Sequence, residues 1–373
     1  MRQPTPPRPG KAAERHPALD YRPPRRLRAA KWALGAVGAG IVIGALYIGL
    51  WYYAAALARN SLLGWVEAQR REGAVVAFEH LDIGGFPFHL RLVLDKPAFS
   101  LPAADAPWGW EAVQVVAEMR PWNFQRFTVQ APGRHALMWT ANGTRWTAEG
   151  HADIVNAQIR LDGGRVVDSH IEVEAADFAG DGPLDRLALG RGTLDLVLSP
   201  GTTATDRTPV ADIRLTARDL GVPTVWGLPL GADIAAIELA AAVLGGVPPG
   251  PLVDALAGWR DGGGTVEVRH LGLIYGPLTL AADGTLALDA DLQPIGAFTT
   301  RIEGFFETVN ALHEKGLIRS QDAVTAKMVL GVLSKRNDAG RISLTVPLTV
   351  QERRLYVGPV PLAVIPPVRW QGR

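Results

Sequence analysis

Hydrophobic and polar residues alternate with a period of two over most of the chain. In the segment Phe88–Asp95, phenylalanine and leucine alternate with His89, Arg91, Val93 and Asp95. This alternation is typical of a half-buried β-strand, whose successive side chains point to opposite faces. Many similar runs follow, and glycine-containing turns separate them. The pattern predicts a mainly β protein with a few helices, built on a large curved antiparallel sheet or a sandwich-like domain.

Three segments depart from this alternation and predict helices. They are Leu252–Trp259, Phe305–Lys315 and Asp322–Lys335, and the last two read as a helical pair. The chain has no clean internal repeat. Two similar halves remain an open alternative, with a break near residues 199–208 or 246–250.

A different pattern, continuous hydrophobicity, covers residues 32–57. No charged residue falls between Lys31 and Arg59, and about 20 apolar residues are enough to cross a bilayer as a helix. Aromatic residues stand at both ends of the span, and such residues favour the two membrane interfaces. These aromatic residues are Trp32, Trp51, Tyr52 and Tyr53. We therefore expect residues 32–57 to form a transmembrane anchor.

Two alternatives to an uncleaved anchor account for this span less well. A buried helix of a soluble core does not account for aromatic residues at both ends. A cleaved signal peptide would use the small residues of Ala56-Leu57-Ala58, but the apolar region of a signal peptide is shorter, about 7–15 residues. We therefore favour the anchor.

Small residues inside the span raise the question of self-association. Gly40 and Gly44 have the spacing that lets two membrane helices approach closely. Glycine is also common in membrane helices that stay single, so both interpretations stay open.

The charges that flank the span predict its orientation. Residues 1–31 contain nine Lys or Arg and two acidic residues, a net charge of +7, whereas the whole chain carries +1. Positively charged flanks are retained in the cytoplasm, so the N-terminus is expected there and the large remainder on the far side. The segment is rich in proline and poor in large aliphatic residues, which predicts disorder.

The predicted organisation therefore has four parts. A basic cytoplasmic tail occupies residues 1–31, and the anchor occupies 32–57. A juxtamembrane helix follows over 58–73, and a β-rich domain fills 74–373.

The composition of the chain and the motifs it lacks argue against several classes of function. The chain has no cysteine, so it has neither disulfides nor thiol chemistry. Its basic residues concentrate before the span, which argues against nucleic acid as a partner of the exported part. We find no nucleotide-binding, serine-hydrolase or zinc-protease motif. His151 and Asp153 come closest to a ligand pair, but a solvated strand face explains them better. We expect no enzymatic activity, cofactor or metal.

Tryptophan is frequent, with eleven residues in the chain. Tryptophans of this kind either line an apolar ligand groove or fill a large β core, and the core is the commoner place. Those in the β-rich segment are Trp108, Trp110, Trp122, Trp139, Trp146, Trp226, Trp259 and Trp370.

Three groups of short motifs rich in glycine and proline resemble a known family. The first group is Gly64-Trp65, Arg70-Arg71-Glu72-Gly73 and Gly84-Gly85-Phe86-Pro87-Phe88. The second is Tyr275-Gly276-Pro277, Gly284 and Pro294-Ile295-Gly296. The third is Val346-Pro347-Leu348, the segment 355–362 and Pro366-Pro367. From about residue 60 to its end the chain resembles the domain-of-unknown-function 2125 family of membrane-anchored bacterial proteins, although Arg70-Arg71 is an extra bulky pair.

The resemblance implies a Gram-negative inner-membrane protein whose main domain faces the periplasm, and it implies no enzymatic activity. The closing motifs are also similar to those of large periplasmic β-rich proteins implicated in lipid handling and outer-membrane assembly. Within the motifs we expect Gly85, Phe86, Pro87, Gly358 and Pro359 to have a structural role.

Two functions are compatible with a membrane-tethered sheet that has one apolar face. The face either shields a lipid or another hydrophobic ligand, or it is a closed core and the protein is a scaffold that docks envelope proteins. A long apolar groove with two open ends favours the first function, and a filled sandwich favours the second.

Overall fold

The computed structural model describes residues 25–370 except 103–106, 142–143, 200–208, 337–339, 358–359 and 369. These residues form four α-helices and 21 strands, and every strand belongs to one antiparallel sheet. The chain divides into two compact units, Met1–Tyr52 and Tyr53–Arg373. The predicted mainly β fold with few helices is confirmed. The predicted tail falls outside the described residues up to residue 24.

One continuous helix, α1 (Arg25–Arg71), contains both the predicted anchor and the predicted juxtamembrane helix. The part of the chain that the structure describes has one helix long and apolar enough to cross a membrane, and its candidate span begins at Trp32. The helix ends at Arg71, and Gly73 follows with a left-handed φ of 92°. Glycine adopts such a φ at little cost, so it ends the helix here as the sequence predicts.

The strands follow the alternating segments of the sequence, and the remaining helices follow the three predicted helical segments. The strands of the first part are β1 (Val75–Ala77), β2 (His80–Gly84), β3 (Leu90–Asp95), β4 (Ala98–Leu101), β5 (Trp108–Ala112), β6 (Gln114–Arg120), β7 (Asn123–Gln130), β8 (Gly133–Ala141), β9 (Thr144–Ala152), β10 (Ile154–Asp162) and β11 (Arg165–Gly180). The second part comprises β12 (Arg186–Leu198), β13 (Pro209–Gly221), β14 (Asp233–Leu244), α2 (Leu252–Asp261), β15 (Thr265–Tyr275), β16 (Leu278–Leu288), β17 (Pro294–Glu303), α3 (Phe305–Glu314), α4 (Ser320–Leu333), β18 (Lys335–Arg336), β19 (Ile342–Gln351), β20 (Arg354–Val357) and β21 (Val360–Val364).

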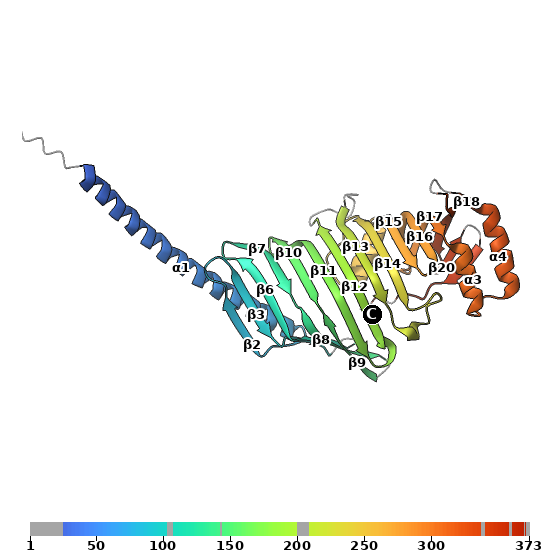
Figure 1. Ribbon diagram of the computed structural model, residues 1–373, viewed down its shortest axis with the longest axis horizontal. Helices are drawn as coiled ribbons and strands as arrows, with labels where there is room; N and C mark the ends of the chain where they lie inside the picture. The colour runs from blue at the N-terminus through green and yellow to red at the C-terminus, as the bar shows by residue number, and fades with distance from the viewer. Residues whose placement is uncertain are drawn as a thin grey trace, which may run out of the picture. The chain divides into compact units, whose positions relative to one another are not determined.

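Strand β11 divides the sheet into two walls. Its first part, up to Glu174, pairs with β10, and β7, β6, β3 and β2 continue this first wall. Its last part, from Asp177, pairs with β9, and β8, β5, β4 and β1 continue the second wall. Both parts pair with β12, and β13 to β17 and then β19 extend the sheet in order (Figure 1).

A line of irregular positions crosses the sheet where the two walls meet. The register skips Ala175 and Gly190 between β11 and β12, and it skips Gly190 and Asp219 between β12 and β13. Ala175 and Asp219 have left-handed φ values of 49° and 53°. Because these residues interrupt the ladder, the alternation changes phase there. The hydrophobic side chains of both walls therefore face the same side, which is the inner face of the sheet.

Helices pack on the inner face near its ends and along one margin. The end of α1 places Val66 against Val76 of β1. Helix α2 buries Trp259 in a cluster with residues of β14, β15 and β16, and α3 packs Phe305 against Leu344 of β19. Burial of the apolar side of each helix holds it in place. Among the described residues, these helices thus cover three separate buried clusters.

The structure corrects some predicted boundaries. Strand β3 begins at Leu90, because Phe88 and His89 belong to the preceding turn. The alternation over Leu355–Val360 predicts one strand, but the structure has two, β20 and β21, and residues 358–359 between them lie outside the described part of the chain. The strands on either side of residues 199–208 and of residues 246–250 belong to the same sheet, since β12 pairs with β13 and β14 pairs with β15.

Candidate functional site: an apolar groove

The inner face carries a continuous row of side chains that face each other in the strand register, from β2 across to β19. We call it the inner row. All its members are hydrophobic except Thr300. They are Ile83, Leu92, Ala117, Val129, Ala157, Ile171, Leu194, Leu215, Leu239, Leu271, Ala282, Thr300 and Val346.

The inner row is buried towards its two ends and open in its middle. Leu92 is 4% exposed and Val346 is 9% exposed. In contrast, the central residues Leu194, Leu215 and Leu239 are only partly buried. A second sheet packed on this face would bury such leucines at the density of a protein interior. The middle of the inner row therefore lines an open apolar groove.

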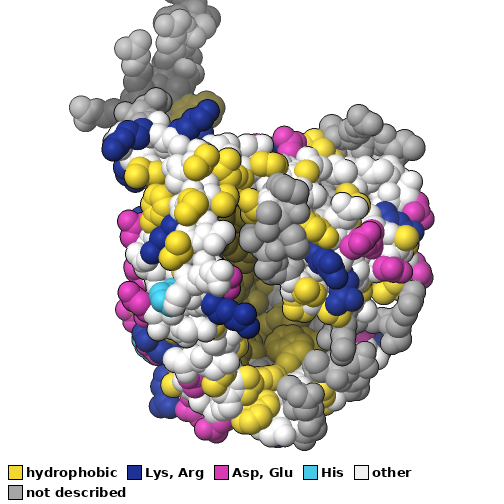
Figure 2. All heavy atoms as spheres, turned by 90° about the vertical axis from the view of Figure 1, so that its right-hand side faces the viewer, with side chains coloured by type: hydrophobic (Ala, Val, Ile, Leu, Met, Phe, Trp, Pro, Cys, Tyr) yellow, Lys and Arg dark blue, Asp and Glu magenta, His cyan; other side chains and the backbone are white. Residues whose placement is uncertain are grey.

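The space-filling view shows this hollow directly. In Figure 2 the molecule is hollowed between two walls, and hydrophobic side chains line the depth of the hollow. Lysine, arginine and acidic side chains gather on the outer surface in the same view. A concave apolar site with polar surroundings is the usual form of a site for hydrophobic ligands.

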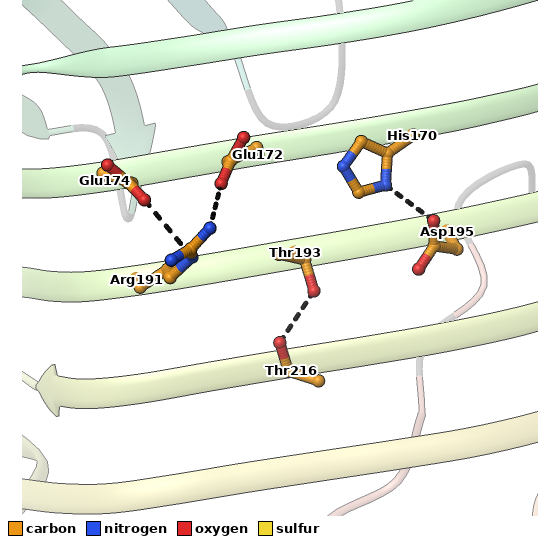
Figure 3. Close-up of polar contacts among 7 residues, drawn as sticks. All are labelled: His170, Glu172, Glu174, Arg191, Thr193, Asp195 and Thr216. Atoms are coloured by element: carbon orange, nitrogen blue, oxygen red, sulfur yellow. Dashed lines mark hydrogen bonds and ion pairs between the residues drawn. The ribbon is translucent and has the colours of Figure 1, made fainter.

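The outer face of the same strands is polar. His170 Nδ1 lies 2.6 Å from Asp195 Oδ1 across β11 and β12. Arg191 forms ion pairs with Glu172, at 2.5 Å, and with Glu174, at 3.2 Å (Figure 3). Exposed pairs of this kind contribute at most about 1 kcal/mol each. These polar and charged side chains show that the outer side of the sheet faces solvent. The apolar surface that a ligand could cover is therefore confined to the inner side.

One histidine lies on the inner face. His135 of β8 is 6% exposed, and its ring stacks on Trp110 with the ring centroids 6.0 Å apart. Neither ring nitrogen has a hydrogen-bond partner among the described residues. Burial lowers the pKa of this imidazole below its usual value of 6.5, so His135 stays neutral where an exposed histidine is partly charged.

This burial predicts an acid-sensitive contribution to stability. The unfolded chain binds a proton at His135 near pH 6.5, whereas the folded protein binds it only at lower pH. The stabilising contribution is therefore complete above pH 6.5 and is lost as the pH falls through the folded pKa. We expect H135L to be at least as stable as the wild type at pH 7.5 and to lose less stability on going to pH 5. Urea unfolding of both proteins at the two pH values measures the difference, and equal losses would show that His135 has no such role.

The Gly-Phe-Pro motif forms a tight turn before β3. Gly85 has a φ of 96°, and its carbonyl accepts a hydrogen bond of 3.0 Å from the amide of His89. The Phe86–Pro87 peptide bond is cis, and the Phe86 side chain is 51% exposed. The left-handed φ of Gly85 makes this tight turn possible. The other two predicted motif residues, Gly358 and Pro359, lie outside the described residues.

The geometry of this turn predicts a contrast between two neighbouring glycines. A Cβ at Gly85 would lie 2.8 Å from the carbonyl oxygen of His89, in a backbone conformation that disfavours any side chain. We expect G85A to lower the free energy of unfolding by about 1–3 kcal/mol. At Gly84 a Cβ meets nothing within 4 Å, so G84A should change stability by less than about 0.5 kcal/mol. Denaturant unfolding tests the pair, and equal effects would contradict the interpretation.

The predicted anchor residues all lie on α1. Trp32 is 81% exposed, and Tyr52 and Tyr53 are 65% and 67% exposed. Trp51 is buried instead, at 5% exposure, and its ring packs edge-on against that of Tyr52 at 5.3 Å. Space is open around Gly40 and Gly44, where a Cβ would meet no atom within 4 Å.

The tryptophans of the β-rich segment have no single role. Trp259 is the member of this group that is buried, at 5% exposure. Trp122 and Trp226 are 55% and 54% exposed. Trp108 is 43% exposed and packs against Phe99. One of these tryptophans is therefore a core residue, and others are exposed at the surface.

His151 and Asp153, which come closest to a ligand pair in the sequence, form a surface contact. His151 Nε2 lies 3.0 Å from Asp153 Oδ1, and both side chains are more than half exposed. Among the described residues no group of three His, Asp or Glu side chains is placed to hold a metal ion.

The sequence predicts the inward position of some inner-face residues but not the exposure of the central leucines. The alternation places His135 on the same face as Leu137 and Trp139, so its inward position follows from the sequence pattern. Thr300, which is 0% exposed and has an unpartnered hydroxyl, also follows the alternation of β17. In contrast, no sequence signal distinguishes the partly exposed leucines of the middle from the buried residues near the ends, because that difference depends on what covers each one.

Comparison with known proteins identifies the family. A model of the family described as "Uncharacterized protein conserved in bacteria (DUF2125)" matches residues 51–366. Neither the curated proteins nor the solved structures contain a significant match to this chain. The matched region includes the end of α1 and all 21 strands of the sheet. The chain therefore belongs to this family of bacterial proteins.

Proposed function

We propose that the β-rich domain binds the hydrocarbon part of a lipid, or of a similarly elongated hydrophobic molecule, along the groove. The observation that carries this proposal is the partly exposed middle of the inner row, where Leu194, Leu215 and Leu239 come from three adjacent strands. Burying a fully exposed large aliphatic side chain contributes about 1.5–3 kcal/mol, and these leucines are already partly buried, so each adds only a fraction of that value. A ligand long enough to cover many residues of the inner row is therefore needed to offset its loss of freedom on binding.

The proposed role is binding and not catalysis. The inner row offers Thr300 as its polar member, and that side chain is fully buried. A ligand in the middle of the groove therefore meets side chains that cannot transfer protons or attack a bond. Hydrophobic contact favours chain-like molecules and discriminates weakly between similar ones.

Native mass spectrometry of the full-length protein, released from a mild detergent, tests this function. Organic extraction of the same sample identifies what co-purifies. We expect a stoichiometric lipid or another hydrophobic molecule. A protein that carries none, and takes up none when lipid is added, would contradict the proposal. Because a membrane-spanning helix is also expected to retain lipid, the groove variant L239E is compared with the outer-face variant A240E, and both keep α1.

We propose further that the tail lies in the cytoplasm and the β-rich domain in the periplasm of a Gram-negative cell. The charge of +7 before the span supports this orientation. The chain lacks cysteine, so a maleimide reagent labels only a cysteine that is introduced by substitution. A membrane-impermeant maleimide applied to cells with a permeable outer membrane should label Q125C and not R8C. The opposite pattern would reverse the orientation.

A second candidate function, docking in the envelope, is favoured by helix α4. Its outward side is apolar, although helices normally turn their polar side to water. The exposed residues are Val324, Met328, Val329, Val332 and Leu333, from 51% to 81% exposed. Residues 315–336 contain five Lys or Arg and one acidic residue. Apolar residues flanked by positive charge fit a membrane surface that contains acidic lipids.

Vesicle tethering tests this second function. Full-length protein is reconstituted into neutral vesicles through α1, and vesicles that contain phosphatidylglycerol are then added. We expect light scattering to report clustering, and V332D to abolish it while T325D on the same helix leaves part of it. Clustering that V332D does not affect, or none at all, would exclude α4 as a membrane-docking surface.

A further inference from the structure

The outer face of the first wall contains a second, polar concavity. It has a volume of about 650 Å³ and lies over β6, β7, β10 and the beginning of β11. The polar and charged side chains that line it alternate with the inner row, so they lie on the side of the sheet opposite the groove. It is therefore a separate site from the groove, with different chemistry.

Arginines from three neighbouring strands meet in this concavity. They are Arg120 of β6, Arg126 of β7 and Arg160 of β10. In the register, Arg126 stands directly opposite Arg160. Like charges that face each other across two strands destabilise a sheet. Negative charge between the two guanidinium groups would relieve this repulsion.

The acidic side chains of the site supply only part of that charge. Asp168 stands opposite Arg160 on the other side, and its Oδ2 lies 3.4 Å from the Arg160 guanidinium. Glu118 is paired with Arg91, which lies outside the cavity lining, at 3.2 Å. Among the described residues Arg120 and Arg126 have no hydrogen-bond or ion-pair partner, and Arg126 is exposed.

Neutral donors and two histidines complete the site. Thr128 and Gln158 stand opposite each other on β7 and β10, two residues along each strand from the arginine pair. His170 also lines the site and is bound to Asp195 at 2.6 Å. His89 lines it as well. The hydroxyl and the amide can each donate to an oxygen of a ligand held by the guanidinium groups.

We propose that this concavity binds a phosphate group, with Arg126 and Arg160 holding its oxygens from two sides and Arg120 adding a third positive charge. Guanidinium groups match the oxygens of phosphate in geometry and charge. The bound anion reduces the repulsion between Arg126 and Arg160, so binding and sheet stability are coupled. The phosphate belongs either to a lipid headgroup, which carries one negative charge when it is a diester, or to a small soluble molecule whose monoester carries up to two.

Calorimetric titration of the full-length protein in a non-ionic detergent tests the site. The probes are inorganic phosphate and glycerol 3-phosphate, with sodium chloride as the blank. We expect a Kd in the millimolar range or lower that R126Q weakens at least about tenfold. The matched control is R301Q, because Arg301 is an exposed outer-face arginine on β17, away from the cavity. It should bind like the wild type. Tighter binding of glycerol 3-phosphate than of phosphate indicates that the glycerol part is also bound, as in a lipid headgroup. Equal or weaker binding indicates that the site recognises the phosphate group alone, as in a small soluble phosphate.

Thermal unfolding supplies a second readout. Without phosphate, R126Q should unfold at a higher temperature than the wild type, because the substitution removes the like-charge pair. Phosphate should raise the unfolding temperature of the wild type and leave that of R126Q unchanged. No binding of either probe, or the same binding by R126Q and the wild type, would overturn the proposal. Neither result bears on the groove, whose ligand contacts the opposite face.

Discussion

The variant L239E is expected to lose the hydrophobic ligand of the groove while keeping its fold. Leu239 lies in the middle of the inner row, between Leu215 of β13 and Leu271 of β15. Placing an ionised carboxylate against a hydrocarbon chain costs about 3 kcal/mol, which corresponds to an affinity about a hundredfold lower. Because Leu239 is partly exposed in the free protein, the carboxylate reaches water when no ligand is present, and the cost to folding is smaller.

The next residue on the same strand provides the control. Ala240 occupies the opposite face, where it stands beside Arg214 in the register. The variant A240E introduces the same charge one position away and gains an oppositely charged neighbour, so we expect it to retain the ligand. Both variants keep α1, and lipid that adheres to the anchor is therefore the same in the two samples.

The measurement is the amount of extracted lipid per protein, together with the native mass of each variant. The thermal unfolding temperature shows whether each variant is folded. A folded L239E that carries as much lipid as A240E would place the lipid elsewhere and remove the groove as its site. Loss of lipid from both variants would instead point to the outer face or to a general destabilisation.

The sequence reveals the strands of this protein well because the physical signal is local. Alternation in a segment such as Ile213–Ala217 needs no information from other segments. The same holds for α2, α3 and α4, whose existence was predicted within a few residues of the observed bounds. Continuous hydrophobicity from Trp32 onwards likewise predicts a helix without reference to the rest of the chain.

The features that make the groove are not local. The bend between the two walls depends on Ala175, Gly190 and Asp219, which occupy neighbouring register positions on β11, β12 and β13. In the sequence they are isolated residues in otherwise regular segments. The double pairing of β11, with β10 and with β9, also joins segments whose partners alternation cannot specify. Alternation therefore predicts a sheet with one apolar face but does not show whether that face is covered.

The phosphate site illustrates the same limit at a smaller scale. Arg126 and Arg160 are separated by a long stretch of sequence, and only the pairing of β7 with β10 sets them opposite each other. Each arginine alone is an ordinary solvated residue of a strand. The unfavourable contact becomes visible when the register is known, and so does the reason for a bound anion.

Replacing Trp259 by alanine is expected to cause the largest loss of stability among single substitutions in the β-rich domain. Its side chain is 5% exposed and belongs to a cluster with Leu288 and Leu292. The indole nitrogen donates a hydrogen bond of 2.9 Å to the carbonyl oxygen of Leu244. The fit is close, because a Cβ at Gly264 would lie 2.3 Å from the Trp259 ring. Truncation leaves a cavity and an unpaired carbonyl, which together cost about 3–5 kcal/mol.

Two further variants show which part of this contact holds α2 on the inner face. W259F keeps one aromatic ring but loses the hydrogen bond and part of the buried packing, so we expect a cost of about 2–3 kcal/mol, below that of W259A. W226A removes an indole that is 54% exposed and should change stability by less than about 1 kcal/mol. Urea unfolding measures all three, and hydrogen exchange of residues 252–261 reports whether α2 detaches before the sheet unfolds. If W259A destabilised the protein no more than W226A, the cluster beneath α2 could not be what keeps this helix against the sheet.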